Sequence, residues 1–332
     1  MLKSRKLIIA YHSLHKTENS ERRPQEYVSR SQSLPVRLFE GHLRWLNTFA
    51  EFVRLDKIIS SQPTDHWQIA VTFDDGYYDN IELGLPLFRR YQVPVTWFVC
   101  TRYVQNSNRL PWWDLIGYVA RYYRNTLDVT TLKWQRTYDL TLSKDRREFK
   151  REVREAFLNS SLENRERLYS QIASLCRGIV KETRNAFADK ESIRRAAESP
   201  WITIGGHTVS HPNLSVETNE TVESELKRGR HLLQSWTGQP VKWFAYPYGR
   251  TEHYNDGVRR CVEESGFHGA VTTERGYVDD VQNRFEVPRF MVPTYGGMSS
   301  FRLGVLALNQ VDWFMQKAGR TVHWFRSALS TR

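Results

Sequence analysis

Cysteine is scarce in this chain, and its spacing offers no framework for disulfide bonds. The three cysteines, Cys100, Cys176 and Cys261, are odd in number and far apart, which excludes the paired pattern of a small secreted domain. We interpret them as ordinary reduced residues. Their scarcity favours the cytoplasm.

Long hydrophobic runs are also absent. No stretch approaches the ~18 consecutive apolar residues that a membrane-spanning helix needs. The apolar run near the N-terminus covers only residues 7–10, which is too short for the core of a signal peptide. We therefore expect a cytoplasmic protein without a signal peptide, either in solution or in peripheral contact with an anionic membrane. The sequence carries no indication of oligomeric state.

Acidic residues are too few to balance the basic ones, and the formal net charge is +11. Residues 101–200 hold 20 Lys and Arg against 13 Asp and Glu, so this region alone contributes +7. Helices with a few surplus arginines are usually just solvated surfaces, and we do not expect nucleic acid as a partner. An anionic glycan or membrane face remains a partner that this charge would suit.

Apolar and aromatic residues are plentiful, at 40% and 13% of 332 residues, which excludes a disordered chain. Strand-like and helical patterns alternate, so the fold class is α/β, and one β/α barrel with an insertion fits as well as two domains. We expect a seven-stranded (β/α) barrel, closed or incomplete, with strands beginning near Lys6, Gln68, Val93, Trp201, Lys242, His268 and Phe285.

Helical periodicity interrupts this alternation between residues 101 and 199. We interpret that stretch as a helical insertion, which leaves residues 1–100 and 200–298 as the barrel. Residues 299–332 form a C-terminal helical, basic segment in this interpretation. Helices are also expected over residues 41–60 and 79–91.

Two adjacent carboxylates, Asp74 and Asp75, follow a predicted buried strand over residues 68–73 and precede Gly76. An isolated Asp-Asp-Gly is more often a helix cap or turn than a site. At a strand end, however, neighbouring side chains point in different directions, so one carboxylate can hold a metal ion while the other accepts a proton.

A second motif changes that balance. His207 and His211 follow another apolar strand that ends in two glycines, and their spacing of four predicts two imidazoles on one helical face. One Asp and two His make a three-ligand site with an open position, which suits Zn²⁺, Co²⁺ or Ni²⁺. Because Asp75 and His207 lie far apart in sequence, the fold must assemble such a site.

The motifs Thr-Phe-Asp-Asp-Gly at 72–76, His-Thr-Val-Ser-His-Pro at 207–212 and Phe-Ala-Tyr-Pro-Tyr-Gly at 244–249 occur in the order seen in one family. With them, the chain resembles the polysaccharide deacetylase family, the NodB-type domain of carbohydrate esterase family 4. The resemblance spans residues 6–292. It implies a metal-dependent carbohydrate N-deacetylase that acts on an N-acetylated polysaccharide or glycan precursor, with zinc as the most common metal.

The resemblance also implies roles for individual residues. Asp75, His207 and His211 would be the metal ligands and Asp74 the general base. The backbone N–H near Tyr248 would stabilise the oxyanion.

Aromatic residues around the motifs suit stacking on sugar rings, although core packing is the better expectation for any one of them. Tyr77, Tyr246 and Pro247 are the substrate-binding candidates.

The chain departs from the family pattern in two places. Ala245 stands where the third motif usually has an arginine, and no C-terminal Leu-x-His motif follows. Arg289, on a predicted strand, could supply the missing charge to Asp74. His12 ends the first strand and could supply the missing acid, since Tyr11-His12 resembles the N-terminal Tyr-His of circularly permuted deacetylases.

Other functions fit parts of this pattern. Two His and one carboxylate also occur in non-haem iron oxygenases, but there the acid lies close to the first His and the fold is usually an antiparallel double sheet. A catalytically impaired glycan-binding protein is kept open by Ala245, and an O-acetyl esterase on the same fold stays a second alternative.

Overall fold

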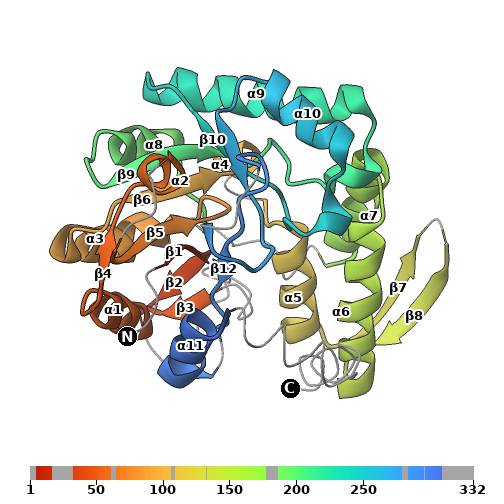
Figure 1. Ribbon diagram of the computed structural model, residues 1–332. Coiled ribbons are helices and arrows are strands. Elements are labelled where there is room, and N and C mark those ends of the chain that lie inside the picture. The colour runs from red at the N-terminus through yellow and green to blue at the C-terminus, as the bar shows by residue number, and fades with distance from the viewer. Residues whose placement is uncertain are drawn as a thin grey trace, which may run out of the picture.

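A curled sheet of parallel strands forms the centre of the molecule (Figure 1). The computed structural model describes residues 5–16, 33–60, 65–105, 109–131, 133–176, 186–278, 283–294 and 296–308. Seven strands lie side by side in the order in which the chain makes them, with the last beside the first. They are β1 (Lys6–Tyr11), β5 (Trp67–Phe73), β6 (Val95–Val99), β9 (Ile202–Gly206), β10 (Trp243–Ala245), β11 (Gly269–Val271) and β12 (Phe290–Met291).

The first and last strands are neighbours, as a barrel requires. Ile9 of β1 pairs with Phe290 of β12 in parallel register. On the other side, the segment before β12 reaches β11 through a single bridge between Val271 and Val287. Pro288 has no backbone N–H, so a regular ladder cannot run through this segment, and the predicted strand over 285–292 shrinks to β12. The fold is therefore the predicted (β/α) barrel in its incomplete form.

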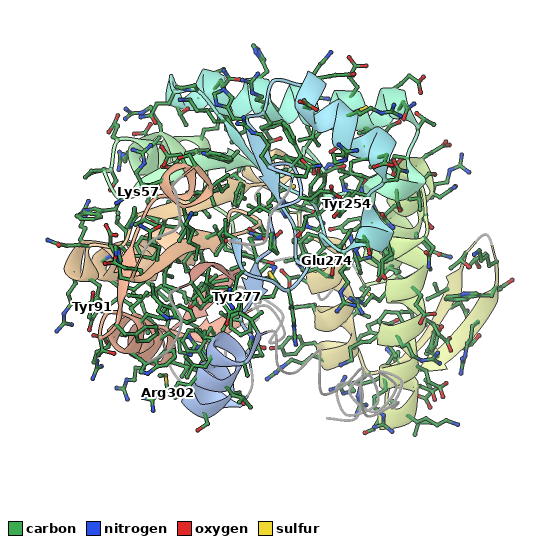
Figure 2. All side chains as sticks on the ribbon, in the orientation of Figure 1. Lys57, Tyr91, Tyr254, Glu274, Tyr277 and Arg302 are labelled. Carbon is green, nitrogen blue, oxygen red and sulfur yellow. The ribbon has the colours of Figure 1, made fainter. Side chains whose placement is uncertain are left out.

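Helices pack around the outside of this sheet (Figure 1). Tyr277 ties the last of them to the barrel, because its hydroxyl donates a 3.1 Å hydrogen bond to the Val305 carbonyl (Figure 2). The part of the C-terminal segment beyond residue 308 lies outside the described residues. The outer helices are α1 (Val36–Leu46), α2 (Leu55–Ser60), α3 (Leu85–Tyr91), α8 (Lys190–Ala197), α9 (Asn219–Thr237), α10 (Asp256–Glu264) and α11 (Gly297–Leu306).

Two predicted helices differ from the observed elements. The single helix expected over 41–60 is instead α1, the short strand β4 (Ala50–Phe52) and α2, because β4 pairs with the start of β5. The helix expected over 79–91 begins as a π-helical turn, Asn80–Gly84, before α3. Short strands β2 (Ser13–His15) and β3 (Ser33–Pro35) form a separate parallel pair.

The region predicted as a helical insertion lies to one side of the barrel, at the right in Figure 1. It has a hydrophobic core of its own between residues 110 and 176, narrower than the predicted range, because α8 and Val104 join the barrel core. Its elements are α4 (Thr101–Gln105), α5 (Trp112–Tyr122), the hairpin β7 (Thr126–Thr130) and β8 (Gln135–Asp139), α6 (Ser143–Leu158) and α7 (Leu162–Leu175). None of the described helices is long and apolar enough to cross a membrane.

Candidate active site

The predicted site residues gather at the carboxyl ends of the strands, where β/α barrels carry their chemistry. Asp74 and Asp75 follow β5, and His207 follows β9. Asp75 has a φ of 74° and Gly76 one of 92°, so the chain turns sharply after the strand. An aspartate in the left-handed region is strained, and the strain is located where the chain presents two adjacent carboxylates at the end of β5.

Three potential metal ligands converge. Oδ1 of Asp75 lies 3.5 Å from Nε2 of His207 and 3.4 Å from Nε2 of His211, and ligand atoms of all three residues lie within 4.8 Å of one another. All three side chains are buried. Oδ1 of Asp75 accepts no hydrogen bond within the described part of the chain, so a buried lone pair faces two imidazoles. This donor set fits a divalent cation such as Zn²⁺.

A backbone carbonyl fixes the tautomer of His207. Nδ1 of His207 lies 2.7 Å from the carbonyl oxygen of Ala245. Because a carbonyl can only accept, Nδ1 carries a proton, and Nε2 is the nitrogen that faces Asp75. The residue that replaces the family arginine therefore contributes a backbone contact to the site.

The two histidines lie in a loop, and the prediction that they share a helical face is wrong. Thr208 and His211 have φ values of 63° and 57°, which a right-handed helix excludes. Glu225 of α9 holds the loop, since its carboxylate accepts from the backbone N–H groups of Val209 and Ser210 at 2.9 and 2.8 Å. A buried acid thus replaces the backbone bonds that a helix would have made.

The charge predicted for Asp74 comes from Arg289, which precedes β12. Nη1 and Nη2 of Arg289 each lie 2.8 Å from one oxygen of the Asp74 carboxylate, and both side chains are buried. Burial raises the pKa of the Asp74 carboxyl, but Arg289, with smaller effects from His207 and His12, outweighs burial, and the net shift is downward. Asp74 is therefore ionised at neutral pH.

Comparison with known proteins agrees with this geometry. The family model described as polysaccharide deacetylase matches residues 61–171 and 173–270, which is more than half of the chain. This chain belongs to the polysaccharide deacetylase family. It is accordingly a hydrolase that acts on carbon–nitrogen bonds other than peptide bonds.

Relatives share the fold at low identity. This deacetylase is 21% identical over 279 residues to YxkH of Bacillus subtilis (strain 168), named as a polysaccharide deacetylase, covering 82% of this chain and 70% of YxkH. It resembles the solved structure of IcaB from Ammonifex degensii, with a TM-score of 0.57 and 16% identity. The match covers 92% of this chain and 97% of IcaB. It also resembles the solved structure of the de-N-acetylase from Aggregatibacter actinomycetemcomitans, with a TM-score of 0.56 and 15% identity. The match covers 90% of this chain and 99% of that chain.

His12 and Tyr248 both lie at this rim of the barrel. Nδ2 of Asn80 donates a 2.7 Å hydrogen bond to the His12 carbonyl and fixes the end of β1. The His12 ring lies near enough to Asp74 and His211 for its charge to influence the pKa of each. Tyr248, with a φ of 61°, donates from its hydroxyl to the His211 carbonyl at 3.2 Å.

The aromatic substrate-binding candidates lie in the core. Tyr77 is fully buried and donates a 3.0 Å hydrogen bond to the buried Asp114. Tyr246 is also buried and stacks on Tyr254, with ring centroids 4.3 Å apart. Neither ring has an exposed face on which a sugar could stack, so both tyrosines serve in core packing. Pro247 is buried between Tyr246 and the turn at Tyr248.

Two tryptophans of the insertion contact the site. The ring of Trp113 packs against His211, with centroids 4.6 Å apart. Nε1 of Trp112 donates a 3.0 Å hydrogen bond to the Tyr248 hydroxyl. The sequence marks them only as a Trp-Trp pair that begins a helix after Pro111. In the sequence, Glu225 appears only as an acidic residue among the apolar positions of the segment that forms α9.

Replacement of Arg289 by methionine tests the buried ion pair. The variant leaves the Asp74 carboxylate buried without its cation, so we expect a loss of about 3–5 kcal/mol in the free energy of unfolding at neutral pH. Urea denaturation measures it. In an Asp74→Asn background the same substitution should cost much less, because no charge remains to be paired. Equal costs in both backgrounds would show that the pair is not coupled.

Proposed function

We propose that this protein removes N-acetyl groups from an N-acetylhexosamine unit of a polysaccharide or glycan precursor, with the aid of a divalent metal ion. The observation that carries the proposal is the convergence of Asp75, His207 and His211 beside the Asp74–Arg289 pair. A three-ligand site next to an ionised carboxylate is the arrangement that amide hydrolysis by water needs.

The residues of the chain divide the proton transfers between them. Asp74 accepts a proton from the attacking water as its oxygen bonds to the acetyl carbon. The backbone N–H near Tyr248 donates to the carbonyl oxygen as negative charge develops on it. When the carbon–nitrogen bond breaks, His12 gives a proton to the departing nitrogen. Acetate and an amino sugar result. Asp74 then releases its proton to solvent and His12 takes one up from solvent, which restores both side chains for the next turnover.

Arg289 has a positioning role in this scheme. Its two hydrogen bonds to Asp74 fix the plane of the carboxylate, and two further bonds, to the Thr272 carbonyl at 2.8 Å and the Thr72 hydroxyl at 3.1 Å, fix the guanidinium. The base is thereby held ionised and in one orientation.

A divalent ion held by Asp75, His207 and His211 would supply Lewis acidity to the acetyl carbonyl and lower the pKa of water. His211 is suited to holding it. Burial first, and then the charges of His207 and Arg165, lower the pKa of His211 well below its usual range, so the imidazole is neutral and can act as a ligand.

The glycan-binding alternative rested on Ala245 and the missing charge beside Asp74. Arg289, which precedes β12, supplies a guanidinium to Asp74, so this reason for expecting impaired catalysis is removed. An O-acetyl esterase would need the same groups, and only the substrate can separate the two reactions.

Acetate release from a panel of acetylated glycans tests the function. We expect release from N-acetylated oligosaccharides, its loss on treatment with a chelator, and its return when Zn²⁺, Co²⁺ or Ni²⁺ is added. The same panel should contain O-acetylated sugars with blocked amines. Release from these alone would assign an esterase, and release that resists the chelator would contradict metal dependence.

A further inference from the structure

The two histidines of the candidate metal centre are held in different ways. Nδ1 of His207 lies 2.7 Å from the Ala245 carbonyl of β10, and this hydrogen bond fixes the ring. Nδ1 of His211 is buried and has no hydrogen-bond partner among the described residues. Metal-binding imidazoles usually donate their second N–H to an acceptor that orients the ring, and loss of that partner weakens metal binding by roughly 10–100-fold. The orientation of the His211 ring therefore depends on other contacts.

Aromatic packing takes the place of the missing hydrogen bond. The Trp113 ring lies against the His211 ring, with centroids 4.6 Å apart and planes inclined at 56°. The Tyr248 ring meets His211 edge-on, also at 4.6 Å. His211 is only 6% exposed, so its ring cannot tilt without displacing one of these neighbours. With both rings in place, Nε2 of His211 lies 3.4 Å from Oδ1 of Asp75.

The backbone of His211 also depends on partners outside its own loop. Its φ of 57° lies in the left-handed region, which costs free energy for a residue with a Cβ. Its carbonyl accepts from Arg165 of α7 at 2.9 Å and from the Tyr248 hydroxyl at 3.2 Å. Trp112 of α5 in turn donates to that hydroxyl at 3.0 Å. Helices of the predicted insertion thus hold the main chain of this ligand as well as its ring.

Trp113 is itself fixed in place. It is the second residue of α5, and its Nε1 donates a 3.0 Å hydrogen bond to the hydroxyl of Tyr77, which follows β5 of the barrel. It packs against two hydrophobic clusters, one within the predicted insertion and one that contains Tyr77. A side chain that is locked by packing and by a hydrogen bond can impose one orientation on the ring beside it.

We propose that Trp113 is a positioning residue of the metal centre and that α5 completes the site by holding the His211 ring in the orientation that binds the ion. The barrel supplies Asp75 and His207, whereas the third ligand takes its orientation from the predicted insertion. The inference rests on the metal centre of the proposed function. It adds a dependence of metal affinity on the packing of α5.

Metal affinity tests the role of Trp113. Competition with a chromogenic chelator, without substrate, gives the dissociation constant for Zn²⁺ of wild type, Trp113→Met and Trp113→Phe. Trp113→Met fills the space with a flexible chain but removes the ring, and we expect it to weaken Zn²⁺ binding by roughly 10–100-fold. Trp113→Phe loses the bond to Tyr77 but keeps a ring against His211, so it should retain most of the affinity. Trp113→Leu replaces Trp113→Met if the latter does not fold.

The absorption spectrum of bound Co²⁺ provides a readout that a loss of stability alone would not change. Its visible bands depend on the number and geometry of the ligands. Saturated Trp113→Phe should give the spectrum of wild type. Saturated Trp113→Met should give shifted or weaker bands, because the His211 ring no longer has one orientation. Identical spectra and equal dissociation constants in all three proteins would overturn the proposal.

Trp134→Met is the matched control. Trp134 is also half-buried and packs against the core of the predicted insertion, where its ring meets Tyr138 with centroids 6.3 Å apart. Its substitution should lower the Tm of the metal-free protein and leave the dissociation constant for Zn²⁺ unchanged. An equal loss of affinity in Trp134→Met and Trp113→Met would contradict the positioning role, because general loosening of the predicted insertion would then explain both.

Metal binding and acetate release decide different questions. If zinc-loaded wild type released no acetate from any glycan, weaker Zn²⁺ binding by Trp113→Met than by Trp113→Phe would still support the role of Trp113. If wild type released acetate and Trp113→Met bound Zn²⁺ as tightly as wild type, the positioning role would be refuted while the deacetylase function stood.

Discussion

Asp75→Ala is expected to lose its bound divalent metal and to reduce acetate release by about 10³-fold or more, because Lewis acidity worth several kcal/mol in the transition state disappears. The protein should remain folded. Oδ1 of Asp75 has no hydrogen-bond partner in the described part of the chain, so no hydrogen bond to that oxygen is lost on substitution. Metal analysis and thermal unfolding are the measurements.

The two measurements should give different results for wild type and variant. Saturating Zn²⁺ should raise the Tm of wild type, since an ion that binds only the folded state stabilises it, and should leave the Tm of Asp75→Ala unchanged. Asp256→Ala is the matched control, because Asp256 is an exposed aspartate of α10 whose partner is Arg259. Equal metal stoichiometry in wild type and Asp75→Ala would remove Asp75 from the site.

His12→Ala is expected to lower kcat by roughly 10²–10⁴-fold with metal content intact, which is the range for loss of a general acid. The pairing of β1 with β12 places the end of β1 beside the segment that carries Arg289. Asp74 follows β5, which pairs with β1 along its whole length, so His12 and Asp74 lie at the same end of neighbouring strands. Steady-state kinetics and metal analysis on the same preparation measure the effect.

The neighbouring histidine provides the control. His15 lies three residues further, in β2, and its Nδ1 lies 3.0 Å from the Ser33 hydroxyl. His15→Ala should keep near-normal turnover. Substrates with a better leaving group should narrow the gap between wild type and His12→Ala, because they need less help from an acid. Near-normal turnover of His12→Ala on all substrates would assign the acid to another residue.

The local parts of this site were predictable from sequence. A buried strand followed by Asp74, Asp75 and Gly76 is a property of a few adjacent residues, and the structure confirms the strand. The positive φ of Gly76 shows how the chain turns there. The barrel class and the order of its strands also follow from alternating periodicities along the chain. Such patterns depend on neighbours in sequence, so one chain is enough to see them.

The conformation of the histidine loop was not predictable in the same way. The spacing of His207 and His211 fits a helix, but the loop is held open by Glu225 from α9 and by positive φ values at Thr208 and His211. An acid 14 residues beyond the second histidine gives no local signal. Tyr77 was likewise assigned to substrate from its place beside the motif, whereas its contact with Asp114 of the insertion buries it.

The sequence by itself determined the residue types that do chemistry and the strand ends that carry them, because those follow from local pattern and side-chain chemistry. Only the tertiary structure decided their partners. Arg289 reaches Asp74 across 215 positions because β12 pairs with β1, and Trp113 reaches His211 because the insertion packs on the barrel rim. Contacts between distant segments depend on strand register and packing, which local propensities do not encode.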